Sequence, residues 1–171
     1  QRQMCIRDRY DTARYLESVE LLNRWFDRPA VTTDLITGFP EETEEEFAQT
    51  LDFIRKCRFA QMHIFPYSIR PGTPAAKMDD PVSHKEKARW MAELLALQEQ
   101  ISAEQMQLHR GETFKCFVSG KGKLGDNYVA ARTDGNLIIE FEGDDSLIGS
   151  FQNVKVIEPL TYVLRGELER N

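Results

Sequence analysis

The residues of this chain best suited to chemistry lie in or just after two predicted β-strands, and the first set lies in the run Thr33-Asp-Leu-Ile-Thr-Gly-Phe-Pro40. Asp34 places a carboxylate in an otherwise apolar strand, where burial requires hydrogen bonds or a cation to offset desolvation. It can therefore hold a neighbouring loop or contact a polar ligand. Gly38 lets backbone approach a ligand closely. The structural alternative is that Asp34 only ties the fold together and Gly38 only turns the chain.

The second set lies in the run His63-Ile-Phe-Pro-Tyr-Ser-Ile-Arg-Pro-Gly-Thr-Pro74, one predicted helix later. An imidazole, a phenol, a hydroxyl and a guanidinium so close together can orient an anionic or purine ligand. These groups belong to His63, Tyr67, Ser68 and Arg70. A strand histidine is more often a satisfied core residue than a catalyst, so Arg70 is the better candidate. No nucleophile–base pair, phosphate-binding glycine loop or metal-ligand spacing occurs in the sequence, which predicts neither a complete active site nor a metal site.

The elements around these two sets explain why they should meet. Strand, helix and strand in succession form a right-handed βαβ unit, whose parallel strands end at one edge where ligands bind. We expect the first strand to be buried on both faces and Glu42 to Glu46 to be solvated and to compensate the helix dipole. The expected elements are a helix capped by Asp11 or Thr12 and ended before Pro29, a strand over 31–36, a helix over 42–55 with Phe47, Leu51 and Ile54 inward, and a strand over 61–65.

The C-terminal part of the chain has a different character. A capping box of Ser83 and Glu86 predicts the start of a long helix that runs to His109 and ends before Gly111. Short alternating runs then predict five strands, which favour a small closed barrel of the OB type. Asp134-Gly135 predicts a hairpin between two of them. The five expected strands cover 113–119, 127–132, 137–141, 153–157 and 162–168.

Basic and aromatic residues of this β-rich part suit a nucleic acid strand. The candidates for RNA binding are Lys115, Lys121, Lys123, Tyr128 and Arg132. Residues 111–171 nevertheless hold seven Lys and Arg against ten Asp and Glu, so the signal is weak. We expect most of the other rings, Phe114, Phe141, Phe151 and Tyr162, to lie in the core.

Composition sets the broad class of the protein. A hydrophobic fraction of 41% over 171 residues supports a globular core, and a net charge of −6 argues against broad nonspecific binding of polyanions. We expect no membrane segment and a reducing cytoplasmic location. The three cysteines, Cys5, Cys57 and Cys116, form no CxxC pair, which argues against a disulfide framework or a zinc site.

Two of the motifs bear a resemblance to a known family. DLITGFPEETEEEF over residues 34–47 resembles the TD-x-I-x-GFPGET-x-E-x-F signature of the radical S-adenosylmethionine (SAM) methylthiotransferases, and HIFPYSIRPGTPAA over 63–76 resembles their next strand and loop. The part after Gly111 is similar to their RNA-binding TRAM domain. The resemblance implies an α/β fold followed by a β-barrel. It assigns residues 10–110 to the C-terminal part of a radical SAM (β/α) barrel and 111–171 to a TRAM-like barrel. Residues 1–9 show no apolar period, so we expect a tail or an artefactual junction there.

The branch of this family can be predicted from smaller differences. Enzymes acting on isopentenyladenosine in tRNA tend to have F-x-Y-S-x-R-x-GT after the second strand. His63-Ile-Phe-Pro-Tyr-Ser with Thr33-Asp34 upstream looks most like the branch that adds a methylthio group to C2 of N6-threonylcarbamoyladenosine beside the anticodon. The alternatives are the isopentenyladenosine branch, the ribosomal-protein branch and a stand-alone RNA-binding module.

The resemblance also implies cofactors and partners. The family uses SAM and two 4Fe-4S clusters, one held by a CxxxCxxC motif, and it acts on tRNA, here on the anticodon stem-loop. The cysteines of this chain lack that spacing, so we expect an inactive fragment of a transferase that needs a missing N-terminal part. The expected cofactor-site residues are Asp34, Ile36, Gly38, His63, Tyr67, Ser68 and Arg70.

One residue departs from the family pattern, which has glycine where this chain has Glu41. If that position requires a positive φ angle, a glutamate there costs about 1–2 kcal/mol.

Overall fold

The computed structural model describes residues 11–169, which divide into two compact units between Ile101 and Ser102. The expected tail of residues 1–9, with Cys5, lies outside the described residues. Within the described range, no helix combines the length and hydrophobicity that crossing a membrane requires.

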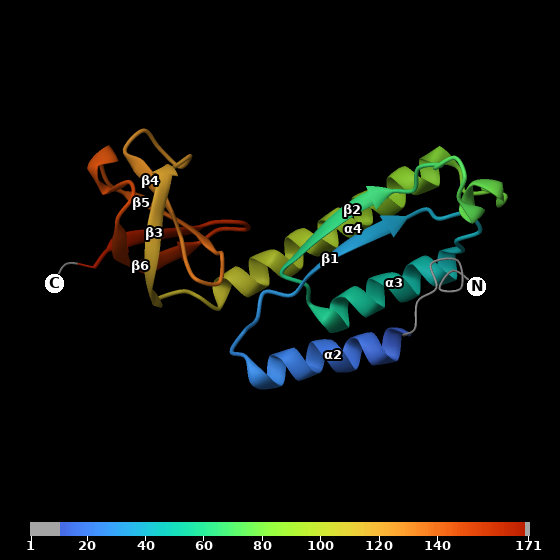
Figure 1. Ribbon diagram of the computed structural model, residues 1–171, viewed down its shortest axis with the longest axis horizontal. Coiled ribbons are helices and arrows are strands. Elements are labelled where there is room, and N and C mark those ends of the chain that lie inside the picture. The colour runs from blue at the N-terminus through green and yellow to red at the C-terminus, as the bar shows by residue number, and fades with distance from the viewer. Residues whose placement is uncertain (1–10, 170–171) are drawn as a thin grey trace. The chain divides into compact units, whose positions relative to one another are not determined.

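The first unit contains the predicted βαβ motif (Figure 1). Strands β1 and β2 pair in parallel, with Asp34 opposite His63 and Ile36 opposite Phe65, which confirms the predicted topology. The elements are α2 (Thr12–Trp25), β1 (Thr32–Thr37), α3 (Glu44–Cys57), β2 (Gln61–Pro66), the 3-10 helix η1 (Pro74–Lys77) and α4 (His84–Gln107), which continues past the division between the units.

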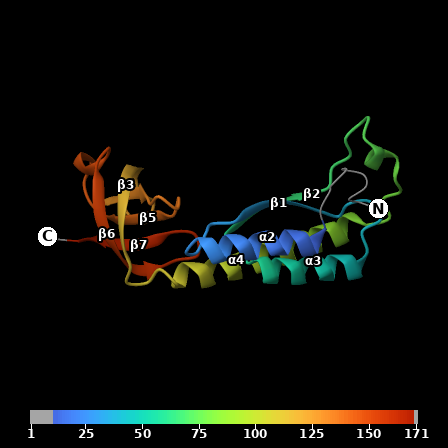
Figure 2. The ribbon, with the colours of Figure 1, turned by 60° about the horizontal axis from the view of Figure 1, so that its bottom comes forward.

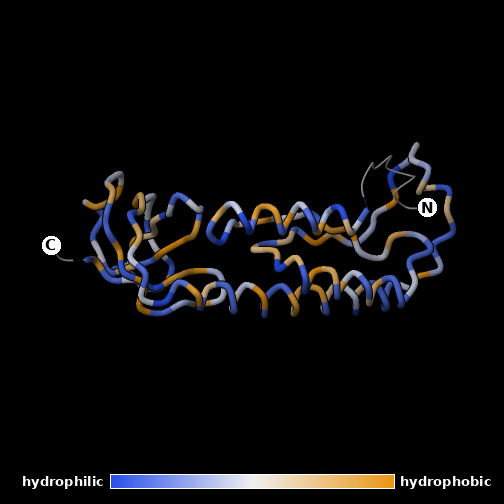
Figure 3. Tube along the Cα trace, turned by 90° about the horizontal axis from the view of Figure 1, so that it is seen from below, coloured by the Kyte–Doolittle hydropathy of each residue, from blue (hydrophilic) through white to orange (hydrophobic). Residues whose placement is uncertain are grey.

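The helices of the first unit lie along one side of the two strands (Figure 2). Apolar residues recur along each helix (Figure 3), and their inward members form one core that includes Val19, Phe47, Ile54 and Leu94. Phe47, predicted to face inward, stacks on Trp90 of α4 with ring centroids 4.8 Å apart. Large buried rings of this kind contribute much of the free energy of folding.

The other side of the two strands is exposed, so the prediction that β1 is buried on both faces is wrong. Side chains of Thr32, Asp34 and Ile36 face outward in β1, and Ile36 is 55% exposed. Phe65, opposite Ile36 on β2, is 52% exposed. A continuous apolar run is typical of a strand covered on both sides, but among the described residues the helices cover one side only.

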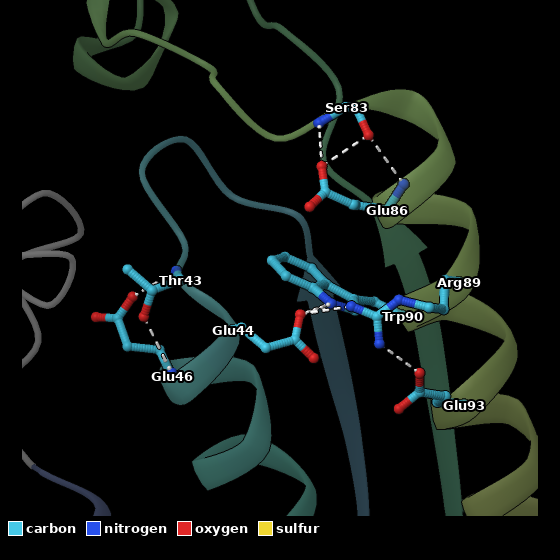
Figure 4. A network of polar contacts seen from close by, with 8 residues as sticks. All are labelled: Thr43, Glu44, Glu46, Ser83, Glu86, Arg89, Trp90 and Glu93. Atoms are coloured by element: carbon cyan, nitrogen blue, oxygen red, sulfur yellow. Dashed lines mark hydrogen bonds and ion pairs between the residues drawn. The ribbon is translucent and has the colours of Figure 1, made fainter.

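Two capping boxes and one carboxylate that joins the helices order the N-terminal ends of α3 and α4 (Figure 4). Thr43 and Glu46 form a capping box at α3, and Ser83 and Glu86 form the predicted one at α4. The Glu44 carboxylate joins the two helices, since it accepts hydrogen bonds from Arg89 at 2.5 Å and from the Trp90 indole at 3.0 Å. These hydrogen bonds, the one from Arg89 first, lower the pKa of Glu44 below its ordinary value.

The second unit is a closed five-stranded barrel, as predicted. Strand order around it is β3-β4-β5-β7-β6, and all pairs are antiparallel except β5 with β7. Its interior contains Val118, Val129, Ile139, Phe141 and Val154. The strands are β3 (Thr113–Lys121), β4 (Tyr128–Arg132), β5 (Ile138–Glu142), β6 (Phe151–Pro159) and β7 (Leu164–Leu168), with the 3-10 helix η2 (Asp145–Leu147) between β5 and β6.

The predicted hairpin joins β4 to β5. Thr133 N–H donates to the Leu137 carbonyl, and the positive φ angle of the turn falls on Asn136. The left-handed position is therefore one residue after Gly135, and asparagine tolerates it well.

Glu41 has a φ angle of +66°, so the position where the family pattern has glycine does require a left-handed backbone. Replacing it should relieve this strain. We predict that Glu41→Gly raises the free energy of unfolding by about 1 kcal/mol, while Glu41→Ala, which keeps a Cβ, does not. Chemical denaturation of the two variants measures this difference, and equal stabilities would contradict it.

The Glu44 contacts give a pH-dependent prediction. Because the pKa of Glu44 is lower in the folded chain, its carboxylate stabilises the fold fully above its unfolded pKa of about 4.5. This contribution is lost as the pH falls through the lower folded value. Glu44→Gln should therefore lower Tm near neutral pH, and the difference from the wild type should shrink below about pH 4.

Glu45→Gln is the matched control, since it removes a charge from the same first turn. Thermal melts of both variants at several pH values test the prediction. A Tm loss for Glu44→Gln that is the same at low and neutral pH, or is equalled by Glu45→Gln, would contradict it.

Candidate functional site

A cavity of about 600 Å³ opens where the two strands of the first unit end. Parallel pairing places Thr37 opposite Pro66, so the loops that follow β1 and β2 start side by side. The walls are mostly apolar, with polar groups from the second loop. The lining residues are Ile36, Phe39, Phe65, Pro66, Tyr67, Ser68, Arg70, Thr73, Pro74 and Ala75.

A buried carboxylate shapes the first loop. Glu42 is 7% exposed, and its Oε2 atom accepts hydrogen bonds from Gly38 N–H at 2.8 Å and from Phe39 N–H at 3.1 Å. The prediction that Glu42 is solvated at the helix start is wrong, because α3 begins only at Glu44, after the Thr43 cap. Two charge-assisted hydrogen bonds to consecutive amides offset the cost of burying Glu42 and fix the turn.

The second loop is joined to the first through Tyr67. Its N–H donates to the Thr37 carbonyl at 2.8 Å, and its ring packs edge-on against Phe39 with centroids 5.2 Å apart. Lys87 of α4 lies over the same ring, with Nζ 5.6 Å from the centroid, and pairs with Asp80 at 2.5 Å. The two loops therefore form one wall.

Two buried hydroxyls near this junction have no hydrogen-bond partner within the described chain. They are the Oγ1 atom of Thr37 and the phenol oxygen of Tyr67. Buried polar atoms are nearly always paired in folded proteins. Tyr67 also lines the cavity.

The structure brings together some of the predicted cofactor-site residues. Ile36, Tyr67, Ser68 and Arg70 line the cavity, while Gly38 is buried with a φ angle of +69° and is not among the lining residues. Asp34 and His63 are paired in register on the exposed side of the strands and are not among the lining residues. The expectation of a buried Asp34 carboxylate is therefore wrong. Its role and that of His63 remain predictions.

Three residues that shape the site were not predicted from the sequence: Phe39, Glu42 and Lys87. Glu42 could have been found from its place between Pro40 and the Thr43 cap, a turn where a carboxylate faces free amides. Lys87 carries no such signal, because it comes from a distant helix.

The predicted RNA-binding residues lie on the barrel in different surroundings. Lys121 pairs with Asp145 at 3.0 Å, and the Lys123 and Leu124 amides donate to the buried Glu140 carboxylate at 2.7 and 2.8 Å. Tyr128 is half-buried. The Arg132 guanidinium donates to Asn136 at 2.8 Å. Lys115 lies over the ring of Phe151, with Nζ 5.4 Å from its centroid.

Two aromatic side chains expected in the core are exposed. Phe141 is buried and Phe114 is partly buried, but Phe151 is 61% and Tyr162 58% exposed. Phe151 begins β6 on the outward face, and Tyr162 lies in the turn between β6 and β7. Hydrophobicity alone did not reveal which face each ring takes.

The described cysteines are free, buried thiols. Burial raises the pKa of the Cys57 and Cys116 thiols to about 11, so both are protonated at neutral pH. Among residues 11–169, no three His, Cys, Asp or Glu side chains are grouped to hold a metal ion.

Curated relatives agree with the resemblance to methylthiotransferases. The chain is 39% identical over 160 residues to a tRNA-2-methylthio-N(6)-dimethylallyladenosine synthase of Alkaliphilus oremlandii (strain OhILAs), covering 94% of this chain and 34% of that protein. Proteins of the same name from Carboxydothermus hydrogenoformans and Bacillus subtilis (strain 168) are 40% and 36% identical, over 93% and 94% of the chain and 36% and 31% of their own lengths. No protein-family model matches the chain.

The chain thus spans about a third of the length of the curated relatives it matches. Dimethylallyladenosine is the same nucleoside as isopentenyladenosine, so these names favour the alternative branch, and the threonylcarbamoyladenosine prediction is corrected accordingly. The signal was present in the sequence. Residues 65–73, Phe-Pro-Tyr-Ser-Ile-Arg-Pro-Gly-Thr, fit F-x-Y-S-x-R-x-GT at every fixed position.

The contact between Gly38 and Lys87 gives a prediction about the site. A Cβ on Gly38 would lie 2.7 Å from Cγ and 2.9 Å from Cδ of Lys87. We expect Gly38→Ala to lower the free energy of unfolding by about 1–3 kcal/mol, through this clash and the positive φ angle.

A double-mutant cycle with Lys87→Ala separates the two causes. The double variant should recover the part of the free energy of unfolding that the clash removes, and it should still lack the part that the backbone strain removes. Denaturant unfolding measures these free energies. If the losses of the two single variants simply add in the double variant, the contact between Gly38 and Lys87 is contradicted.

Proposed function

We propose that this chain is the C-terminal part of a radical SAM methylthiotransferase that adds a methylthio group to N6-dimethylallyladenosine in tRNA. The single observation that carries the proposal is the identity of 36–40% to synthases of that name along nearly the whole chain. The two loop motifs and the terminal barrel support it, since they follow one another along the chain in the order that the family resemblance implies.

The cavity of the first unit is the proposed place of the adenosine part of SAM. Its volume of about 600 Å³ is ample for a nucleoside, and the unpartnered Tyr67 hydroxyl fits a polar atom of one. Ile36, Phe39 and Phe65 would pack on the base, and Ser68 and Arg70 would face its polar groups. When bound, SAM supplies the methyl group and the radical chemistry.

The role of this chain is to bind and orient. Glu42 holds the Gly38 and Phe39 amides in place, and Lys87 holds the Tyr67 ring, so the wall is formed before ligand arrives. The proposal places the ligands of both 4Fe-4S clusters in the portion of the relatives that this chain does not match. Asp34 and His63 on the outer face of the strands are proposed supports of that portion.

The barrel is the proposed contact with tRNA, through the anticodon stem-loop. Lys115, Lys121, Lys123 and Arg132 are exposed and cationic, and Tyr128 adds a partly exposed ring. Phosphate contacts by such groups give affinity without sequence preference. We place the enzyme in the cytoplasm, where its substrate is modified.

Nucleoside mass spectrometry of tRNA tests the proposed reaction. In a strain that lacks the gene, 2-methylthio-N6-dimethylallyladenosine should disappear and N6-dimethylallyladenosine should accumulate. Loss of the methylthio derivative of threonylcarbamoyladenosine, or of a modified ribosomal protein, with this nucleoside unchanged would contradict the proposal.

A substitution at the cavity tests the proposed binding site. Tyr67→Phe removes a buried hydroxyl that has no partner within the described chain, so it should leave Tm unchanged or raise it. It should nevertheless reduce methylthiolation about tenfold when the full-length gene is returned to the deletion strain, because the ligand loses a hydrogen bond.

Tyr162→Phe is the control, since this exposed tyrosine lies in the other unit. Full activity of Tyr67→Phe at matched protein levels would show that the Tyr67 hydroxyl does not contact the ligand.

A further inference from the structure

Three strands of the barrel place an arginine and two phenylalanines in one row. Arg132 of β4 is directly opposite Phe117 of β3, and Phe117 is directly opposite Phe151 of β6. Side chains directly opposite each other in antiparallel strands lie on the same face of the sheet. Lys115 lies two residues before Phe117 in β3, so it shares this face.

The row lies on the outside of the barrel. The intervening residues Cys116 and Val118 of β3 are fully buried, so the alternation of the strand turns Phe117 outward. Phe117 is 40% exposed and Phe151 61% exposed. Their ring centroids are 5.3 Å apart with a tilt of 58°, so the two rings are in contact and form one exposed aromatic surface with an angled profile.

Cations stand at both ends of this surface. The Lys115 ammonium lies over Phe151 at 5.4 Å from the centroid, and Arg132 stands beside Phe117 in register, held by its hydrogen bond to Asn136. We call Lys115, Phe117, Arg132 and Phe151 the aromatic row. Adjacent exposed rings on a folded domain mark an interaction surface more often than chance exposure.

We propose that the aromatic row is a stacking platform for an unpaired nucleobase, with Lys115 and Arg132 contacting the phosphates on either side. The inference deepens the proposed function, on which it rests, by naming the face of the barrel and the structural class of RNA. Bases stack on aromatic side chains regardless of their identity, and nearby cations follow the backbone. The platform therefore selects single-stranded nucleotides over a duplex, whose bases are already stacked.

A protein partner fits the aromatic row less well, because the centres of protein interfaces are depleted of lysine. A nucleic acid instead uses the rings to stack its bases and the cations to contact its phosphates.

Fluorescence anisotropy with a labelled anticodon stem-loop tests the platform on the 171-residue chain. Phe151→Ala should weaken binding about tenfold without changing the dependence of affinity on salt, because stacking releases no counterions. Phe151→Trp should retain wild-type affinity. Lys115→Gln should weaken binding and reduce the slope of log affinity against log salt by about one.

Tyr162→Ala, another exposed ring of the same barrel, is the control and should bind as the wild type does. Thermal melts verify that each variant is folded. The affinity of the chain for a blunt RNA duplex of equal length should not change on Phe151→Ala.

Wild-type affinity of Phe151→Ala for the stem-loop would overturn the platform while leaving the proposed function intact. A wild-type chain that binds the stem-loop no better than the duplex would overturn the platform as well. A chain that binds neither RNA would count against the RNA-binding role of the barrel itself. A change in oligomeric state rather than RNA affinity on Phe151→Ala, seen by analytical ultracentrifugation, would make the row a protein interface and also overturn the platform.

Discussion

Parallel pairing of β1 with β2 is the constraint on which the candidate site depends. Because both strands run in the same direction, the loops after Thr37 and Pro66 emerge at one edge. The hydrogen bond from Tyr67 N–H to the Thr37 carbonyl continues the pairing beyond the strands. An antiparallel pair would put the two loops at opposite ends, and no common cavity would form.

Each unit uses a buried carboxylate to hold a loop that we assign to ligand binding. Glu42 accepts from the Gly38 and Phe39 amides, and Glu140 accepts from the Lys123 and Leu124 amides. In both cases two consecutive N–H groups face one oxygen, which fixes the backbone while leaving the neighbouring side chains free to contact a ligand. Preorganisation of this kind lowers the entropic cost of binding.

Local patterns predicted the helices, the parallel βαβ unit and the barrel, because capping, alternation and turn chemistry act over a few residues. They failed where contacts between elements distant in the sequence decide which side chains are exposed. Ile36 and Asp34 are exposed because the helices cover one face of the strands, and Phe151 faces outward because of the barrel register. Lys87 reaches the site from α4, which no local spacing could indicate.

The central claim is that the two loops form one nucleoside-binding wall. The most direct measurement is an amide chemical-shift titration of the chain with 5′-deoxyadenosine up to millimolar concentration. We expect saturable shifts at Gly38, Phe39, Tyr67 and Ser68, from both loops together. Shifts confined to one loop, shifts only in the barrel, or none at all would contradict the claim.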